Sequence, residues 1–177
     1  PSFRDERVVV PTSHDAHVAR TFALSLERLD PDDPVDVLAQ RLLARASFFA
    51  PGEPIARDLL AASLRLEGEE SSTLMAAEEA LVRLIELGLL EEGKDGRVLM
   101  HRLVALFARD QGQEAVDRQA VEEAVCFEAN RLNQTGNPGP LMAWQLHLRA
   151  VVEEALVCED YLCASLGNEL TLHLKMI

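Results

Sequence analysis

The sequence contains little that would bind nucleic acid or form disulfides. It has 17 basic residues against 30 acidic residues among 177, which gives a formal net charge of −13. Nucleic-acid-binding domains usually carry a basic face, and because no basic run occurs here, DNA or RNA binding is disfavoured. The three cysteines, Cys126, Cys158 and Cys163, are an odd number without the spacing of a zinc site. We therefore expect free thiols in a reducing cytoplasm.

Membrane and catalytic signals are also absent from the sequence. No apolar run reaches the ~20 residues that a transmembrane helix needs, and the N-terminus lacks the apolar core of a signal peptide. We therefore expect a cytoplasmic chain without membrane contact. The sequence contains no phosphate-binding G-x-x-x-x-G-K-[ST] loop and no G-x-G-x-x-G, G-x-S-x-G, H-E-x-x-H or C-x-x-C motif. We therefore predict no catalytic residue, no metal site and no cofactor held by this chain alone.

Helical patterning is what the sequence does contain. Only 5% of residues are aromatic, whereas Leu and Ala are abundant and hydrophobic residues total 48%, which favours a mainly α fold. Apolar spacings of three and four predict helices over 16–29, 34–49, 55–64, 73–87, 115–132, 141–166 (one helix or two) and 168–177. A further helix is predicted to begin at His101, and Gly167 is predicted to end a helix.

The period of the apolar pattern changes after the predicted helix 73–87. Leu89–Glu92 and Arg97–Met100 flank an Asp-Gly turn, and two short extended segments of this kind predict a β-hairpin. Three helices followed by a hairpin is the order of a winged helix. We therefore predict three parts: an extended lead-in from a missing upstream domain over 1–19, a winged-helix domain over 20–112, and an α-helical linker that begins a tetratricopeptide-like array over 113–177.

Several runs together resemble the winged-helix domain of STAND-class, NB-ARC-type nucleotide switches. Phe22–Leu29 resembles the opening helix of that domain, and Ala50–Ile55 is similar to the loop before its third helix. Ala80–Leu90 resembles the end of the helix before the wing, and Met100–Val104 resembles the bacterial form of the Met-His-Asp motif. Further along, Asn168–Leu174 resembles the first helix of a tetratricopeptide repeat in bacterial members of the class.

The resemblance implies a role for His101. In this family a P-loop ATPase core precedes the winged helix, repeats follow it, and the motif histidine lies near the β-phosphate of ADP in the closed, inactive state. His101 matches that histidine, whereas Arg102 stands where the motif has Asp. The resemblance therefore implies ADP or ATP with Mg²⁺ in the intact protein. It also implies an intramolecular ATPase domain, helical repeats and a protein ligand as partners.

One function is preferred, and two alternatives stay open. Because the chain starts with Pro1 and not Met, we expect a segment excised from a longer protein. The family resemblance implies that this segment is a non-catalytic regulatory module that couples an ATPase core to helical repeats. The first alternative is a free-standing winged-helix DNA-binding transcription regulator with a helical effector domain. Its groove-binding helix would be 73–87, which offers Arg83 but three acidic residues at its polar positions, so DNA is an unlikely partner. The second alternative is an interaction scaffold without any nucleotide.

Overall fold

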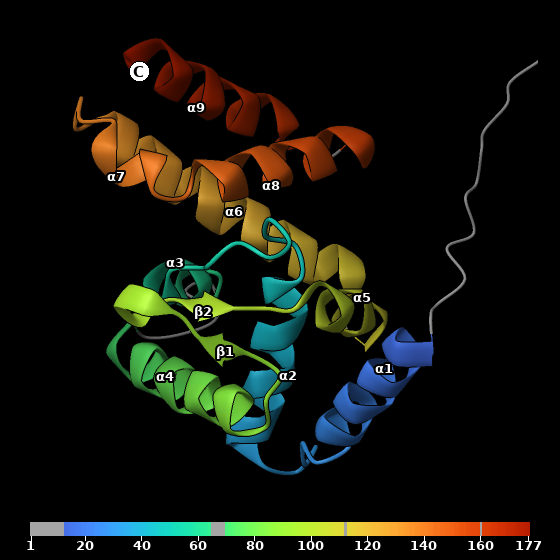
Figure 1. The fold of residues 1–177 in the computed structure, drawn as a ribbon. Helices are drawn as coiled ribbons and strands as arrows, with labels where there is room; N and C mark the ends of the chain where they lie inside the picture. The colour runs from blue at the N-terminus through green and yellow to red at the C-terminus, as the bar shows by residue number, and fades with distance from the viewer. Residues whose placement is uncertain (1–12, 65–69, 112, 160) are drawn as a thin grey trace, which may run out of the picture.

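The structure, a computed structural model, is mainly helical with one small antiparallel hairpin (Figure 1). It describes residues 13–64, 70–111, 113–159 and 161–177. The mainly α class predicted from the composition is therefore confirmed. The described elements are α1 (Ser13–Leu26), α2 (Pro34–Ala46), α3 (Arg57–Ala62), α4 (Glu70–Glu86), β1 (Glu91–Glu92), the 3₁₀ turn η2 (Lys94–Gly96), β2 (Val98–Leu99), α5 (Arg102–Gln111), α6 (Glu114–Asn133), α7 (Gly139–Met142), α8 (Gln145–Val157) and α9 (Cys163–Met176).

Helix α2 begins where the local sequence predicts. The Asp33 carboxylate accepts hydrogen bonds from the backbone N–H groups of Val35 and Asp36, at 2.8 and 3.1 Å. Pro34 occupies the first helical turn, where its missing N–H costs nothing. The helix ends at Ala46, slightly before the predicted boundary.

Two other predicted boundaries are wrong. The predicted lead-in over 1–19 overlaps helix α1 (Ser13–Leu26), which begins and ends slightly earlier than the predicted helix 16–29, whereas residues 1–12 lie outside the described part of the chain. Helix α9 runs through Gly167, which was predicted to stop a helix. A glycine inside a helix costs about 1 kcal/mol relative to alanine. Leu166 and Leu170 of the same helix pack into the core, and this burial outweighs the glycine penalty.

The predicted hairpin is present between α4 and α5. Strands β1 and β2 pair in antiparallel register, with Glu92 opposite Val98. Asp95 and Gly96 in the connecting turn have φ angles of 61° and 73°, the left-handed conformation that the predicted Asp-Gly turn requires. Val98 also forms two backbone hydrogen bonds with Ile55, of 2.7 and 2.9 Å. These bonds attach the second strand to the segment that precedes α3.

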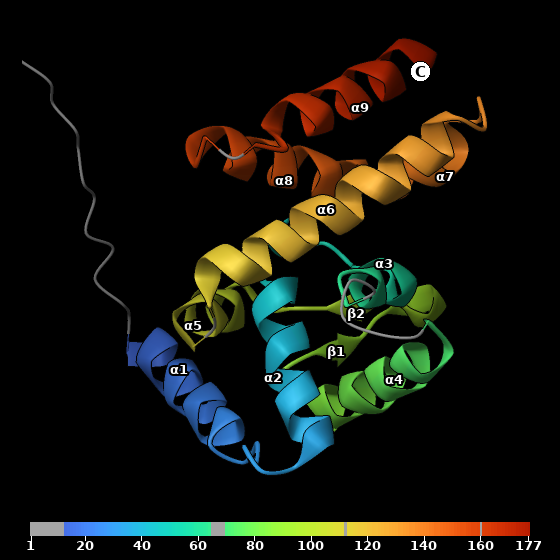
Figure 2. The ribbon, with the colours of Figure 1, turned by 180° about the vertical axis from the view of Figure 1, so that it is seen from behind.

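Helix α2 lies at the centre of the described fold. It packs against α4, α5 and α6, and α8 and α9 pack in turn on α6 (Figures 1 and 2). The predicted segments 20–112 and 113–177 therefore share one hydrophobic core among the described residues. This core includes Leu43, Leu81, Val104, Val125, Leu148 and Leu166.

A buried charge joins three helices inside this core. Arg45 of α2 is 1% exposed, and its Nε lies 3.2 Å from Oδ1 of Asp117 on α6. Its Nη1 donates a 2.6 Å hydrogen bond to the backbone carbonyl of Ser63, just after α3. A charge removed from water is tolerated only when it is paired and hydrogen-bonded. Arg45 therefore holds the relative positions of α2, α3 and α6.

Removing the acidic partner of this pair tests that role. We expect Asp117→Ala to lower the free energy of unfolding by about 3 kcal/mol, because the Arg45 charge stays buried without its carboxylate. The double variant Arg45→Met/Asp117→Leu is expected to lose less, since it buries no charge. Urea denaturation followed by far-UV circular dichroism measures both, with Glu79→Ala on the exposed face of α4 as control. A loss for Asp117→Ala no larger than the control loss would contradict the role.

Candidate functional site

His101 lies between strand β2 and helix α5 and is exposed. Its Nδ1 accepts a 3.2 Å hydrogen bond from the backbone N–H of Leu103, in the first turn of α5. Since Nδ1 is the acceptor, the neutral imidazole carries its hydrogen on Nε2. In this tautomer Nε2 carries the donor N–H of the ring. Arg102, the residue that departs from the family motif, follows it and is also exposed.

The surroundings of His101 come from two helices. The ring of Phe22 on α1 lies against the imidazole, with ring centroids 5.9 Å apart. Helix α1 packs against α5, so His101 marks the junction of these helices. The same two helices expose Leu24 and Leu106, at 56% and 65%. The predicted site residue therefore lies on an accessible surface with apolar neighbours.

The far end of α5 is tied to the rest of the molecule by Arg109. Its guanidinium lies 4.7 Å from the centroid of the Phe48 ring. Its Nε and Nη2 donate to the carbonyl of Ser47 at 3.3 and 3.2 Å, and its Nη1 lies 3.2 Å from Oε1 of Glu154 on α8. Sequence reasoning missed Arg109, because these partners are 62 and 45 residues away and form no local pattern.

His147 of α8 forms a second polar contact between the segment after residue 112 and the segment before it. It is 2% exposed, its Nδ1 accepts from the backbone N–H of Ala50, and its Nε2 faces the carbonyl of Pro54, both at 3.1 Å. The neutral ring with hydrogen on Nε2 satisfies both contacts. The Phe49 ring packs edge-on, 5.4 Å away. Burial lowers the pKa of His147 below its ordinary 6.5, so the ring is neutral in the folded chain near pH 7.

Burial of histidine makes stability depend on pH. Burial also lowers the pKa of His173, which is fully buried and has no hydrogen-bond partner for either ring nitrogen among the described residues. Below about pH 7 the unfolded chain binds more protons than the folded chain, so acidification favours unfolding. We expect the free energy of unfolding, from urea denaturation, to fall between about pH 7 and pH 5.

His173→Leu is the matched variant for this measurement. It is expected to flatten the pH dependence without lowering stability at pH 7, because the buried imidazole loses no hydrogen bond. Stability that rises on acidification, or an unchanged slope in this variant, would contradict the explanation.

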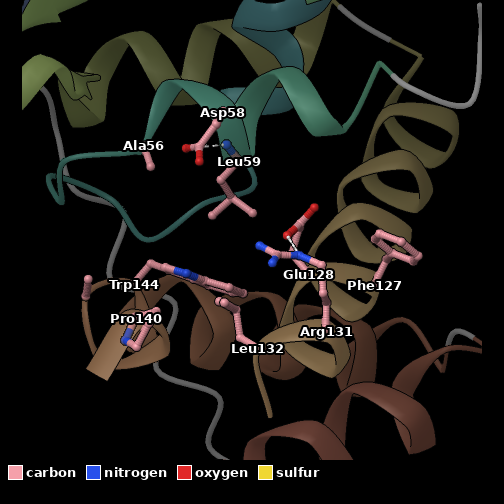
Figure 3. A pocket seen from close by; sticks show the side chains of 10 residues that line it. Ala56, Asp58, Leu59, Phe127, Glu128, Arg131, Leu132, Pro140 and Trp144 are labelled. Atoms are coloured by element: carbon pink, nitrogen blue, oxygen red, sulfur yellow. Dashed lines mark hydrogen bonds and ion pairs between the residues drawn. The ribbon is translucent and has the colours of Figure 1, made fainter. Parts of the chain in front are cut away.

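A cleft opens between α3, α6 and α7, with a volume of about 410 Å³ (Figure 3). Sequence reasoning did not identify it, because its walls come from three separate parts of the chain. Trp144, the single tryptophan of the chain, is only 9% exposed and forms part of the wall. The lining residues are Ala56, Asp58, Leu59, Phe127, Glu128, Arg131, Leu132, Pro140, Ala143 and Trp144.

Within the described ranges, no three or more His, Cys, Asp or Glu side chains lie together in a way that could hold a metal ion. None of the described helices combines the length and the apolar character needed to cross a membrane. No protein-family model, curated protein or solved structure matches the chain.

Proposed function

We propose that this chain is a non-catalytic regulatory module of a STAND-class, NB-ARC-type nucleotide switch. It would couple an upstream P-loop ATPase domain to downstream helical repeats. The observation that carries the proposal is the exposed His101, placed directly after the hairpin at the junction of α1 and α5. In the tautomer that the Nδ1 contact favours, Nε2 carries the N–H that would donate to a group on another domain.

The order of elements supports a winged-helix arrangement. Helices α2, α3 and α4 are followed by the β1–β2 hairpin, which is the order that the family resemblance implies. The bridge between Ile55 and Val98 adds a third extended segment beside the hairpin. The turn at Asp95 and Gly96 forms the tip of the proposed wing. His101 then follows β2 after a single intervening residue, Met100.

The chemistry of His101 suits a phosphate. An imidazole N–H donates hydrogen bonds to phosphate oxygens, and the available donor here is Nε2. Because the chain has no phosphate-binding loop, the upstream domain would hold ADP or ATP together with Mg²⁺. A hydrogen bond from His101 to the diphosphate that forms only in the closed state would shift the equilibrium towards that state.

Helix α5 would transmit a displacement of His101 to helix α8. The helix starts after His101, and close to its end Arg109 binds both the Ser47 carbonyl and the Glu154 carboxylate. An α-helix transmits displacement along its axis because its hydrogen-bonded turns are stiff. A shift of His101 towards a nucleotide would therefore pull on α8, which leads into the helical segment expected to precede the repeats.

The DNA-binding alternative has a specific difficulty in helix α4. Its basic residue, Arg83, is held by Asp36, with Nε and Oδ1 2.7 Å apart. The neighbouring Glu78, Glu79 and Glu86 are exposed, and Glu78 pairs with Arg57, with Oε2 and Nη1 2.8 Å apart. A helix with this excess of carboxylates is repelled by the phosphate backbone of the major groove. The element order alone favours this alternative, and the charge distribution opposes it.

Nucleotide retention in the full-length protein tests the proposed role of His101. We expect His101→Ala to weaken ADP binding about tenfold, because one charge-assisted hydrogen bond to phosphate is lost. The exposed Lys94→Ala on the hairpin is the control and should leave ADP affinity unchanged. Calorimetry with ADP measures both. The isolated chain should bind ADP weakly or not at all, and sub-micromolar binding by it would contradict the proposal.

Salt-dependent DNA binding separates the alternative from the proposal. We expect no binding of a labelled DNA duplex in fluorescence anisotropy at either about 50 or about 200 mM salt, because α4 is acidic. Affinity that falls steeply between the two salt concentrations would instead show phosphate contacts and support the transcription regulator.

A further inference from the structure

We propose that the cleft between α3, α6 and α7 binds a small organic cation, an ammonium or guanidinium group carried on an apolar body. This inference goes beyond the proposed switch and does not depend on it, since every residue of the cleft belongs to the described chain. The volume of about 410 Å³ lies within the range of small-molecule sites.

The walls of the cleft suit an apolar body. Leu59 projects from the α3 side, and Trp144 and Leu132 lie opposite it (Figure 3). Trp144 is nearly buried, so its indole is held in place by the core. A rigid aromatic surface facing an aliphatic side chain accepts a flat or narrow apolar group. The face of an indole also attracts cations.

The charges of the cleft favour a cation over an anion. Glu128 is 9% exposed, and its Oε2 lies 2.8 Å from Nε of Arg131, so these two charges offset each other. Asp58 remains as a further negative charge. Its Oδ1 accepts a 2.9 Å hydrogen bond from the Leu59 N–H, and its carboxylate is exposed. The chain as a whole has a net charge of −13, which attracts cations and repels anions.

The position of the cleft gives binding a structural consequence. Asp58 and Leu59 belong to the segment before residue 112, whereas Glu128, Arg131 and Trp144 belong to the segment after it. A ligand in the cleft would touch both segments, and it would stabilise their packing because it binds only the assembled form.

Two probes that share a phenylethyl body and carry opposite charges test the proposal. We would titrate the isotopically labelled chain with 2-phenylethylammonium and with 3-phenylpropionate, and follow the indole N–H resonance of Trp144, the single tryptophan. The ammonium probe should shift this resonance in a saturable way and raise Tm, and the carboxylate should do neither. A shift with the carboxylate that equals or exceeds the ammonium shift would overturn the proposal, and so would no shift with either probe.

Variants of Asp58 and Arg131 test which charged residue of the cleft contacts the ammonium group. Asp58→Asn should lower the affinity for the ammonium probe about fivefold or more. The asparagine amide oxygen can still accept the hydrogen bond from the Leu59 N–H, so the fold is preserved. Glu79→Gln on α4 removes the same charge away from the cleft and should have no effect. Arg131→Gln should leave ammonium binding unchanged or tighter, because it removes a positive charge. Loss of binding in Arg131→Gln with none in Asp58→Asn would overturn the proposal.

Discussion

The packing of this protein depends on one buried arginine. Arg45 is almost completely removed from water in the last turn of α2, and it contacts Asp117 of α6 and the carbonyl of Ser63. An unpaired charge at this depth would cost several kcal/mol, so only an arrangement that brings all three groups together is stable. Apolar side chains alone would tolerate small shifts of one helix along another. The ion pair restricts α2, α3 and α6 to one relative position.

The same restriction bears on the proposed switch. Arg109 and His147 add two further polar connections across residue 112, to Glu154 and to the Ala50–Pro54 loop. With Arg45 they make the described helices one packed unit, in which the hairpin and α8 are joined through the core. One packed unit suits the proposed relay between a nucleotide-binding domain and a repeat array better than a flexible linker would.

Local chemistry accounts for the features that sequence patterns predicted well. The start of α2 at Asp33 and Pro34, and the hairpin turn at Asp95 and Gly96, depend on residues within a few positions of each other. Helix α9 shows the opposite case, since Gly167 is a local stop signal that the burial of neighbouring leucines overrides. The position of His101 after the hairpin follows from the change of period, which the sequence displays directly, whereas its exposure is known only from the structure.

By itself, the sequence determined the helical class and the hairpin, because both depend on spacing and turn chemistry along a short stretch of chain. The tertiary structure alone decided which charges are buried together and where a cleft opens. Arg45 and Asp117 are 72 residues apart, and His147 and Ala50 are 97 apart. The walls of the cleft likewise come from three helices. No local pattern encodes such pairings, since they exist only once the helices have packed.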